Sequence, residues 1–258
     1  MRACNILHSA VRHGHVYLPV TGFERLFLAA GSAVLALADP QRGDMVAMLG
    51  ETTGERALIN MRDAMRKDAS GAFLLEERPR IVGPSFSPAA LAARHAAGTL
   101  GSAYATHMAT HHFSADQRAP VRLIQDAELA YVMTRYREVH DFWHVLSGLP
   151  PTMLGEVALK WFEAAHTQLP SAAIAALGGP LRLNREGGRV LATKLVPWAL
   201  TAASRAIPLL SVRYEELLDE PLDKVRDLLR FIPAPEVAST HEQGATDVEV
   251  ANTKREAR

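Results

Sequence analysis

Residues 126–156, DAELAYVMTRYREVHDFWHVLSGLPPTMLGE, decide the fold. Asp126 followed by Glu128 is typical of a helix start, because acidic side chains are stabilised in the first turn of a helix. Gly148 is the residue type that ends helices, since glycine adopts the left-handed conformation without steric cost. The stretch therefore predicts a helix from about residue 126 to Gly148.

A second helix is expected to fold back on the first. Pro150 and Pro151 cannot continue the first helix, and Thr152 is a good cap for the next one. That helix is predicted to continue to Leu169, where Pro170 breaks or kinks it. The two helices are thus expected to pack as neighbours joined by a short turn.

The rest of the sequence is also predicted to be helical. Thr21 and Glu24 form a capping-box pattern before an apolar helix at Phe23–Ala38, which is stopped at Asp39-Pro40. No segment shows sustained alternation of polar and apolar residues, and none carries a hairpin signal. The sequence therefore predicts an all-α fold. Further helical patterns lie at 40–50, 58–78, 89–112, 185–206 and 221–231.

The composition limits the class of protein. With 258 residues, of which 48% are hydrophobic, the chain can bury the core of one large domain. The 28 basic residues balance the 28 acidic residues, so no net field would attract nucleic acid. The single cysteine, Cys4, cannot form an internal disulfide, which favours a reducing compartment.

The two ends of the chain differ from the predicted domain. Residues 1–16 contain arginine and histidine but no acidic residue, as mitochondrial transit segments do; an ordinary frayed terminus is the alternative. Residues 17–232 form the predicted single helical domain. Residues 233–258 are predicted to be a disordered tail because they lack aromatic residues and apolar periodicity.

Four polar residues in the two predicted helices suggest a metal site between them. His140 and His144 lie one helical turn apart on the same face, close enough to share one cation. Asp141 is rotated by roughly 100° from His140 and is either a fourth ligand or a partner that orients an imidazole. Glu156 follows His144 after eleven residues, and the turn returns it toward the histidines.

This set of nitrogen and oxygen ligands suits a divalent ion. Zinc is the first expectation, with Fe(II) and Mn(II) as alternatives. An isolated pair of histidines four residues apart is more often a surface or capping pair, so the added carboxylates carry the prediction. His111, His112 and His166 are weaker candidates.

The spacing His140-Asp141-x-x-His144-x11-Glu156 resembles the signature of family four of the coenzyme Q (ubiquinone) biosynthesis proteins. The segments 128–132, 135–139 and 154–156 are also similar to that family, as are 44–47 and 50–54. The resemblance extends over about residues 17–232. It implies a peripheral protein on the matrix side of the mitochondrial inner membrane, which works with other coenzyme Q biosynthesis subunits.

The resemblance also implies a reaction. The expected substrate is 4-hydroxy-3-methoxy-5-polyprenylbenzoate, with its carboxylate near the ion held by His140, Asp141, His144 and Glu156, and the expected reaction is loss of the C1 carboxyl group. Asp141 or Glu156 would protonate C1. A redox metal would instead allow the carboxyl group to be replaced by hydroxyl.

Two other classes of function remain open. One is a non-catalytic lipid-binding scaffold, in which a fully closed ion ties two helices together. The other is a metal phosphohydrolase, although the additional upstream histidine and downstream aspartate that such enzymes need are not evident.

Contact with the membrane is expected to be peripheral, because the apolar helix near residues 23–38 is shorter than the roughly 20 residues needed to span a bilayer. We also expect a homo-oligomer or a complex subunit, because one chain of this size would leave apolar residues exposed.

Overall fold

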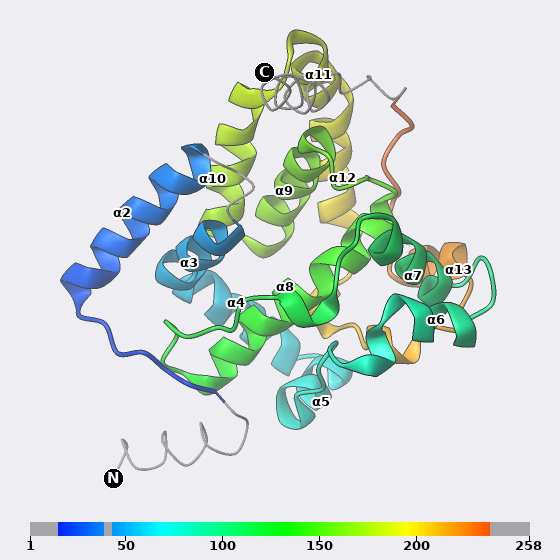
Figure 1. Cartoon of the computed structure of the whole chain (residues 1–258), viewed down its shortest axis with the longest axis horizontal. Coiled ribbons are helices and arrows are strands. Elements are labelled where there is room, and N and C mark those ends of the chain that lie inside the picture. The colour runs from blue at the N-terminus through cyan, green and yellow to red at the C-terminus, as the bar shows by residue number, and fades with distance from the viewer. Residues whose placement is uncertain (1–14, 39–42, 238–258) are drawn as a thin grey trace, which may run out of the picture.

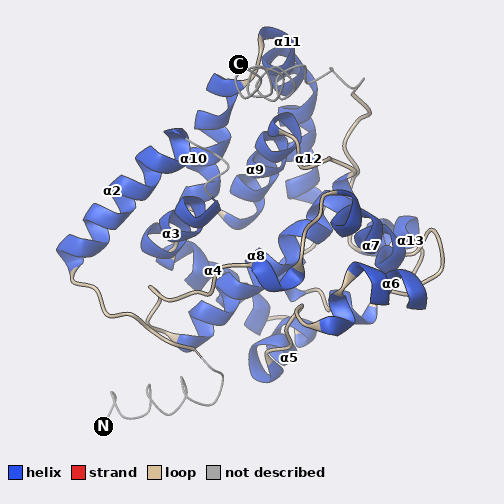
Figure 2. Cartoon of the chain, in the orientation of Figure 1, coloured by secondary structure: helices blue, strands red, loops and turns tan. Residues whose placement is uncertain are grey.

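The computed structural model describes residues 15–38 and 43–237, and these form an all-helical single domain (Figures 1 and 2). Within these residues there is no strand, only an isolated bridge between Thr99 and Pro221. The α-helices are α2 (Gly22–Ala38), α3 (Gly43–Thr53), α4 (Glu55–Arg66), α5 (Ala69–Glu77), α6 (Pro88–Arg94), α7 (Leu100–Thr110), α8 (Ala127–Ser147), α9 (Met153–Thr167), α10 (Pro170–Gly178), α11 (Arg185–Val190), α12 (Val196–Arg205) and α13 (Leu222–Leu228).

Helix α8 runs through the middle of the domain and is buried along most of its length (Figure 1). Its start is capped as predicted, since the Asp126 carboxylate accepts hydrogen bonds from the backbone of Glu128 and Leu129. Its end is also as predicted: Gly148 adopts φ +74° and donates to the carbonyl of His144 at 2.8 Å. The buried helix holds its polar side chains at fixed positions within the core.

The turn from α8 to α9 is short and tightly packed. Thr152 caps α9 by accepting a hydrogen bond from the Gly155 backbone at 3.3 Å, as the sequence predicted. A Cβ atom at Gly155 would lie only 2.0 Å from the Pro150 carbonyl oxygen, so no other residue fits without moving the turn. The close approach fixes the first turn of α9, which carries Glu156, against the end of α8.

Two groups of helices lie on either side of this pair. Helices α2, α3 and α10 pack together on one side, and α10 also packs along α9. Helices α6 and α7 pack together on the other side, where α7 contacts both α8 and α13 (Figure 1). Helix α12 lies against α9 and follows a π-helical turn, η4 (Leu191–Leu195). Helix α8 also contacts α4 and the 3-10 turn η5 (Leu209–Ser211), so its neighbours come from both halves of the sequence.

Other predicted caps and helices are also present in the described part of the chain. The capping box of Thr21 and Glu24 is present, with Thr21 N 2.7 Å from the Glu24 carboxylate. The pattern at 58–78 forms two helices separated at Asp68, whose side chain caps α5, and the pattern at 89–112 forms α6 and α7. Asp39, Pro40 and most of the predicted transit segment and tail lie outside the described residues. No helix in the described part is long and apolar enough to cross a bilayer.

Candidate metal centre

Helices α8 and α9 bring three of the four predicted ligands together. The nitrogen and oxygen atoms that His140, His144 and Glu156 can offer to an ion all lie within 4.8 Å of one another. Glu156 Oε1 is 3.1 Å from His144 Nε2, and Glu156 Oε2 is 3.7 Å from His140 Nε2. His144 is buried, whereas His140 and Glu156 are partly exposed. The three residues thus form a group that is open on one side.

The turn after α8 sets the tautomer of His144. Its Nδ1 lies 2.9 Å from the carbonyl oxygen of Leu149, and because a carbonyl only accepts, Nδ1 carries the proton. Nε2 therefore faces the group. Burial lowers the pKa of the imidazole, but the adjacent Glu156 carboxylate outweighs burial and raises it, and a bound cation would replace the Nε2 proton and use its lone pair. Nε2 is buried and makes no hydrogen bond, although the Glu156 carboxylate is nearby. A buried polar atom without a partner is costly, and a cation at this position would remove the cost.

Glu163 sets the tautomer of His140 and was not predicted from the sequence. Its carboxylate is fully buried, and Oε1 accepts from His140 Nδ1 at 2.6 Å. Its other oxygen, Oε2, accepts from Lys160 Nζ at 2.6 Å and from the hydroxyl of Tyr136. His140 Nε2 is consequently left as the acceptor that faces Glu156. A carboxylate behind a ligating imidazole is the usual partner of metal-binding histidines.

The electrostatics of the group match this arrangement. Burial raises the pKa of the Glu163 carboxyl, but Lys160 and His140 outweigh it and hold that pKa at about 2. Burial also opposes ionisation of Glu156, yet His144 and His140 lower the pKa of its carboxyl well below the usual range. Both carboxylates are therefore ionised at neutral pH, as ligation of a cation and orientation of an imidazole require.

Asp141 lies outside the group of three. Its carboxylate pairs with the guanidinium of Arg118, which also donates to the hydroxyl of Tyr104 at 3.2 Å. Both charged side chains are mostly buried. The pair places Asp141 next to the first histidine without directing its carboxylate to the other three residues. In the described part of the chain, no hydrogen bond joins Asp141 to an imidazole, so both predicted roles, fourth ligand and partner that orients an imidazole, stay predictions.

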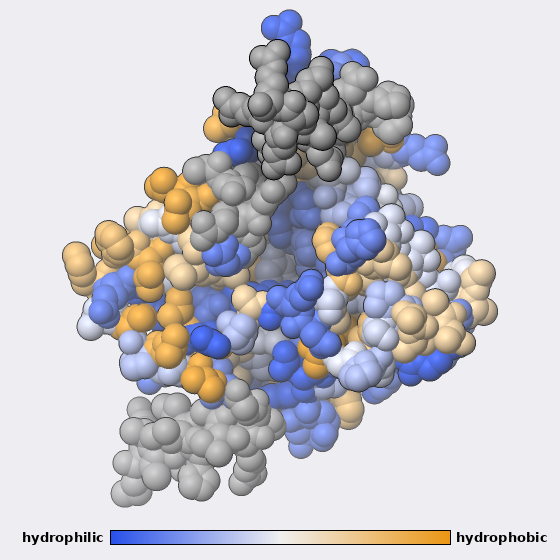
Figure 3. Space-filling view, viewed as in Figure 1, coloured by the Kyte–Doolittle hydropathy of each residue, from blue (hydrophilic) through white to orange (hydrophobic). Residues whose placement is uncertain are grey.

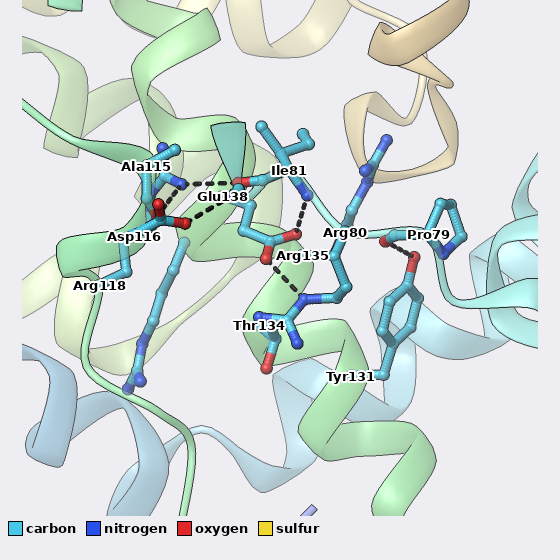
Figure 4. A network of polar contacts seen from close by, with 12 residues as sticks. Pro79, Arg80, Ile81, Ala115, Asp116, Arg118, Tyr131, Thr134, Arg135 and Glu138 are labelled. Atoms are coloured by element: carbon cyan, nitrogen blue, oxygen red, sulfur yellow. Dashed lines mark hydrogen bonds and ion pairs between the residues drawn. The ribbon is translucent and has the colours of Figure 1, made fainter. Parts of the chain in front are cut away.

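The loop that supports Arg118 is fixed to α8 by another buried carboxylate (Figure 4). Glu138 accepts from Arg80 Nε at 2.6 Å and from the Ile81 backbone at 3.2 Å. The Ile81 carbonyl in turn accepts from Arg118 Nη1 at 3.2 Å. The orientation of Arg118, and through it of Asp141, thus depends on a segment 37 residues before Arg118 in the chain.

The residues present therefore fit a divalent ion. In both imidazoles Nδ1 donates to an identified acceptor, the Glu163 carboxylate or the Leu149 carbonyl, and the ionised Glu156 carboxylate faces both Nε2 atoms. Zinc in catalytic sites commonly has three protein ligands of this kind and one open position. The same set of two histidines and one carboxylate also serves non-haem Fe(II). The ligand set alone does not select the metal.

The remaining histidines have different surroundings. His107 of α7, which the sequence did not single out, stacks on His144 with ring centroids 5.4 Å apart. Burial and the neighbouring His144 lower its pKa to about 4, so it is neutral near pH 7. His111 packs against His107, and His112 is exposed. His166 accepts from the Leu209 backbone and lies away from the group.

A cavity of about 1000 Å³ adjoins the group. Its polar lining includes His140, Asp141, Glu156 and Lys160, together with Asp44 and Arg182, and its apolar wall is formed by residues of α2, α3 and α10. That apolar wall includes Ala36 of α2, Val46, Ala47 and Leu49 of α3, and Ile174 and Ala175 of α10. The volume is within the range of sites that enclose small organic ligands.

Comparison with known proteins identifies the family. The model of the coenzyme Q (ubiquinone) biosynthesis protein Coq4 family matches residues 14–235. The chain belongs to the Coq4 family. It is 46% identical over 221 residues to the mitochondrial ubiquinone biosynthesis protein COQ4 homolog of Mus musculus, covering 85% of this chain and 82% of the relative. The human homolog is 44% identical over 219 residues, again covering 85% and 82%.

A solved structure supports the Coq4 fold. The crystal structure of a proposed ubiquinone biosynthesis protein from Nostoc punctiforme superposes with a TM-score of 0.63. It covers 81% of this chain and 98% of its own, at 21% identity, which is evidence for the fold alone. Family membership confirms the resemblance inferred from the sequence signature and gives the protein a role in ubiquinone biosynthesis.

Proposed function

We propose that this Coq4-family protein removes the C1 carboxyl group of 4-hydroxy-3-methoxy-5-polyprenylbenzoate during ubiquinone biosynthesis. The observation that carries the proposal is that His140 and Glu156, two of the three grouped residues, line a cavity that also has an apolar wall. A polar, cation-binding end would receive the ring carboxylate. The apolar end would receive the prenyl tail.

The chain's own residues have distinct parts in this reaction. Breaking the bond between C1 and the carboxyl carbon releases carbon dioxide once C1 has accepted a proton, and the hydroxyl para to C1 donates the electrons that make this possible. Glu156, with its lowered pKa, is suited to ligation rather than to donating that proton. We assign proton transfer to Asp141, which lines the cavity: its carboxylate, held by Arg118, would take a proton from water that enters the cavity and pass it to C1.

His140, His144 and Glu156 would hold the divalent ion, which would supply a positive charge for the substrate carboxylate. An iron-loaded site is a second candidate because the ligand set is that of non-haem Fe(II) oxygenases. Dioxygen and water would then be the co-substrates: hydroxyl would replace the carboxyl group at C1, and carbon dioxide and hydrogen peroxide would be released. Product analysis distinguishes the two outcomes, since the simple reaction yields 2-methoxy-6-polyprenylphenol and the oxidative reaction yields its C1-hydroxylated counterpart.

We further propose a mitochondrial location with peripheral contact to the inner membrane. Homologues are named mitochondrial. Exposed apolar side chains gather over α2, at the left of Figure 3, and include Phe23, Leu26, Phe27 and Val34, with Phe27 71% exposed. The inner side of the same helix contributes Ala36 to the cavity, so a prenyl tail could pass from the bilayer to the site. Phe27→Glu should weaken binding to liposomes without lowering the melting temperature; unchanged binding would contradict this contact.

Other coenzyme Q biosynthesis subunits and a second copy of this chain are the proposed protein partners. A non-catalytic lipid-binding scaffold is the competing function, and it would need the ion fully enclosed by protein ligands. The open side of the group favours the enzyme instead.

The experiment that separates enzyme from scaffold is a decarboxylation assay with a short-tailed benzoate, using the protein loaded in turn with zinc and with iron. Release of carbon dioxide by the wild type and its loss in Glu156→Gln would support the enzyme. No release from either metal form, with intact binding of the benzoate, would support the scaffold.

A further inference from the structure

Lys160 is a mostly buried cation on the cavity wall, and it has no role in the reaction proposed above. It lies one turn after Glu156 on the same face of α9 and lines the cavity, with 17% of its side chain exposed. Its Nζ is 2.6 Å from Glu163 Oε2 and 5.9 Å from the centroid of the Tyr136 ring. Burial lowers the pKa of Lys160, but Glu163 outweighs this and raises it well above its ordinary value.

The hydrogen bonds of Lys160 are incomplete. An ammonium group has three donors; Glu163 accepts one of them, and the hydroxyl of Tyr136 is a second hydrogen-bond partner of Lys160. One donor is thus available at the cavity wall. By contrast, Arg118 and Arg137, which also line the cavity, are occupied by Asp141 and Glu51.

The charge of the site favours an anionic ligand. When an ion is held on their Nε2 lone pairs, His140 and His144 contribute no charge, whereas Glu156 and Glu163 contribute two negative charges and Lys160 one positive charge. A divalent ion on the three ligands would bring this sum to plus one. Because uncompensated buried charge is unfavourable, the loaded site would be neutral with one monoanion bound.

We infer that Lys160 binds the carboxylate of the substrate and positions it beside the ion, which makes it the residue that selects an aromatic carboxylate over the neutral phenol. This inference rests on the proposed function. A mobile surface lysine could not do this well, but Lys160 is preoriented by Glu163 and packed against Tyr136. A charge-assisted contact in a mostly buried site is among the stronger polar interactions.

The test compares two probes that differ by the carboxylate. Calorimetry would measure the Kd of 4-hydroxy-3-methoxybenzoate and of 2-methoxyphenol for zinc-loaded protein, with zinc content measured for every variant. Lys160→Met should weaken benzoate binding by about tenfold or more, as expected for loss of a charge-assisted contact, and leave phenol binding unchanged. Lys160→Arg should retain the preference for the benzoate. Lys224→Met removes a surface lysine that pairs with Glu220 and does not line the cavity; it is the matched control and should leave both constants unchanged.

A second variant separates substrate binding from support of Glu163. If Lys160 acted only through Glu163, the charge-balanced variant Lys160→Met/Glu163→Gln would regain benzoate binding, and that result would overturn the inference. Equal weakening of both probes, or no weakening of benzoate binding, would also overturn it. If Lys160→Met shows the selective loss while the wild type releases no carbon dioxide, the proposed function fails and the binding role of Lys160 stands.

Discussion

Glu163→Gln tests whether the buried carboxylate behind His140 controls the metal centre. Glutamine keeps the shape of the side chain but removes the negative charge of the carboxylate, which accepts hydrogen bonds from His140, Lys160 and Tyr136. Loss of a carboxylate that orients a ligating histidine typically costs 10–100-fold in metal affinity, or about 1.4–2.7 kcal/mol. We expect the Kd for zinc to rise by that factor.

The same substitution should lower stability. Lys160 would lose its ion-pair partner while remaining mostly buried, and breaking a buried pair costs about 3–5 kcal/mol. Because 17% of the lysine side chain reaches the cavity, a value near the lower end is expected. Urea unfolding of the metal-free protein measures this term, and a competition titration against a chelator measures the zinc affinity.

Glu186→Gln is a suitable control, since Glu186 pairs with Arg189 on the surface and lies outside the network. Its removal should leave both the stability and zinc binding essentially unchanged, because exposed ion pairs contribute little. A Glu163→Gln protein with wild-type zinc affinity would show that Glu163 does not orient His140 for ligation.

Three further predictions follow from the same contacts. Asp141→Asn should retain bound metal but lose most decarboxylation, measured as carbon dioxide release; loss of the metal itself would make Asp141 a ligand. Gly155→Ala should reduce zinc affinity and melting temperature together, because its Cβ would lie 2.0 Å from the Pro150 carbonyl oxygen and displace Glu156; an unchanged zinc titration would refute this. Burial raises the pKa of Glu163, but Lys160 and His140 lower it overall, from 4.5 to about 2. The stability advantage of wild type over Glu163→Gln should therefore be full above about pH 4.5 and lost as pH falls toward 2, measured by urea unfolding across this range.

The sequence predicts the helices around the site well because their limits are local. Asp126, Gly148 and Thr152 each form hydrogen bonds with backbone groups within three or four residues, so the start and end of each helix can be inferred from the neighbouring residues. The spacing of His140, His144 and Glu156 then follows from helix geometry and one short turn. By contrast, the separation of α4 from α5 depends on Asp68 capping a new helix inside an apparently continuous apolar pattern.

The interactions that tune the site were less predictable because they join distant segments. Arg118 reaches Asp141 from 23 residues upstream, and nothing in the local pattern marks that pairing. Glu163 carried a usable signal: it lies seven residues, or two turns, after Glu156, between the apolar Phe162 and Ala164. A carboxylate on that face needs a buried partner, and His140 was the nearest candidate.

Metal content after dialysis, measured on wild type, His144→Ala and Glu156→Ala, tests the metal assignment most directly. Circular dichroism would establish that each variant is folded, which matters because His144 is buried while Glu156 is partly exposed. The wild type should retain one divalent ion per chain, and both variants should lose it while staying helical. Full retention of the ion by a folded His144→Ala or Glu156→Ala protein would contradict the assignment of these residues as its ligands.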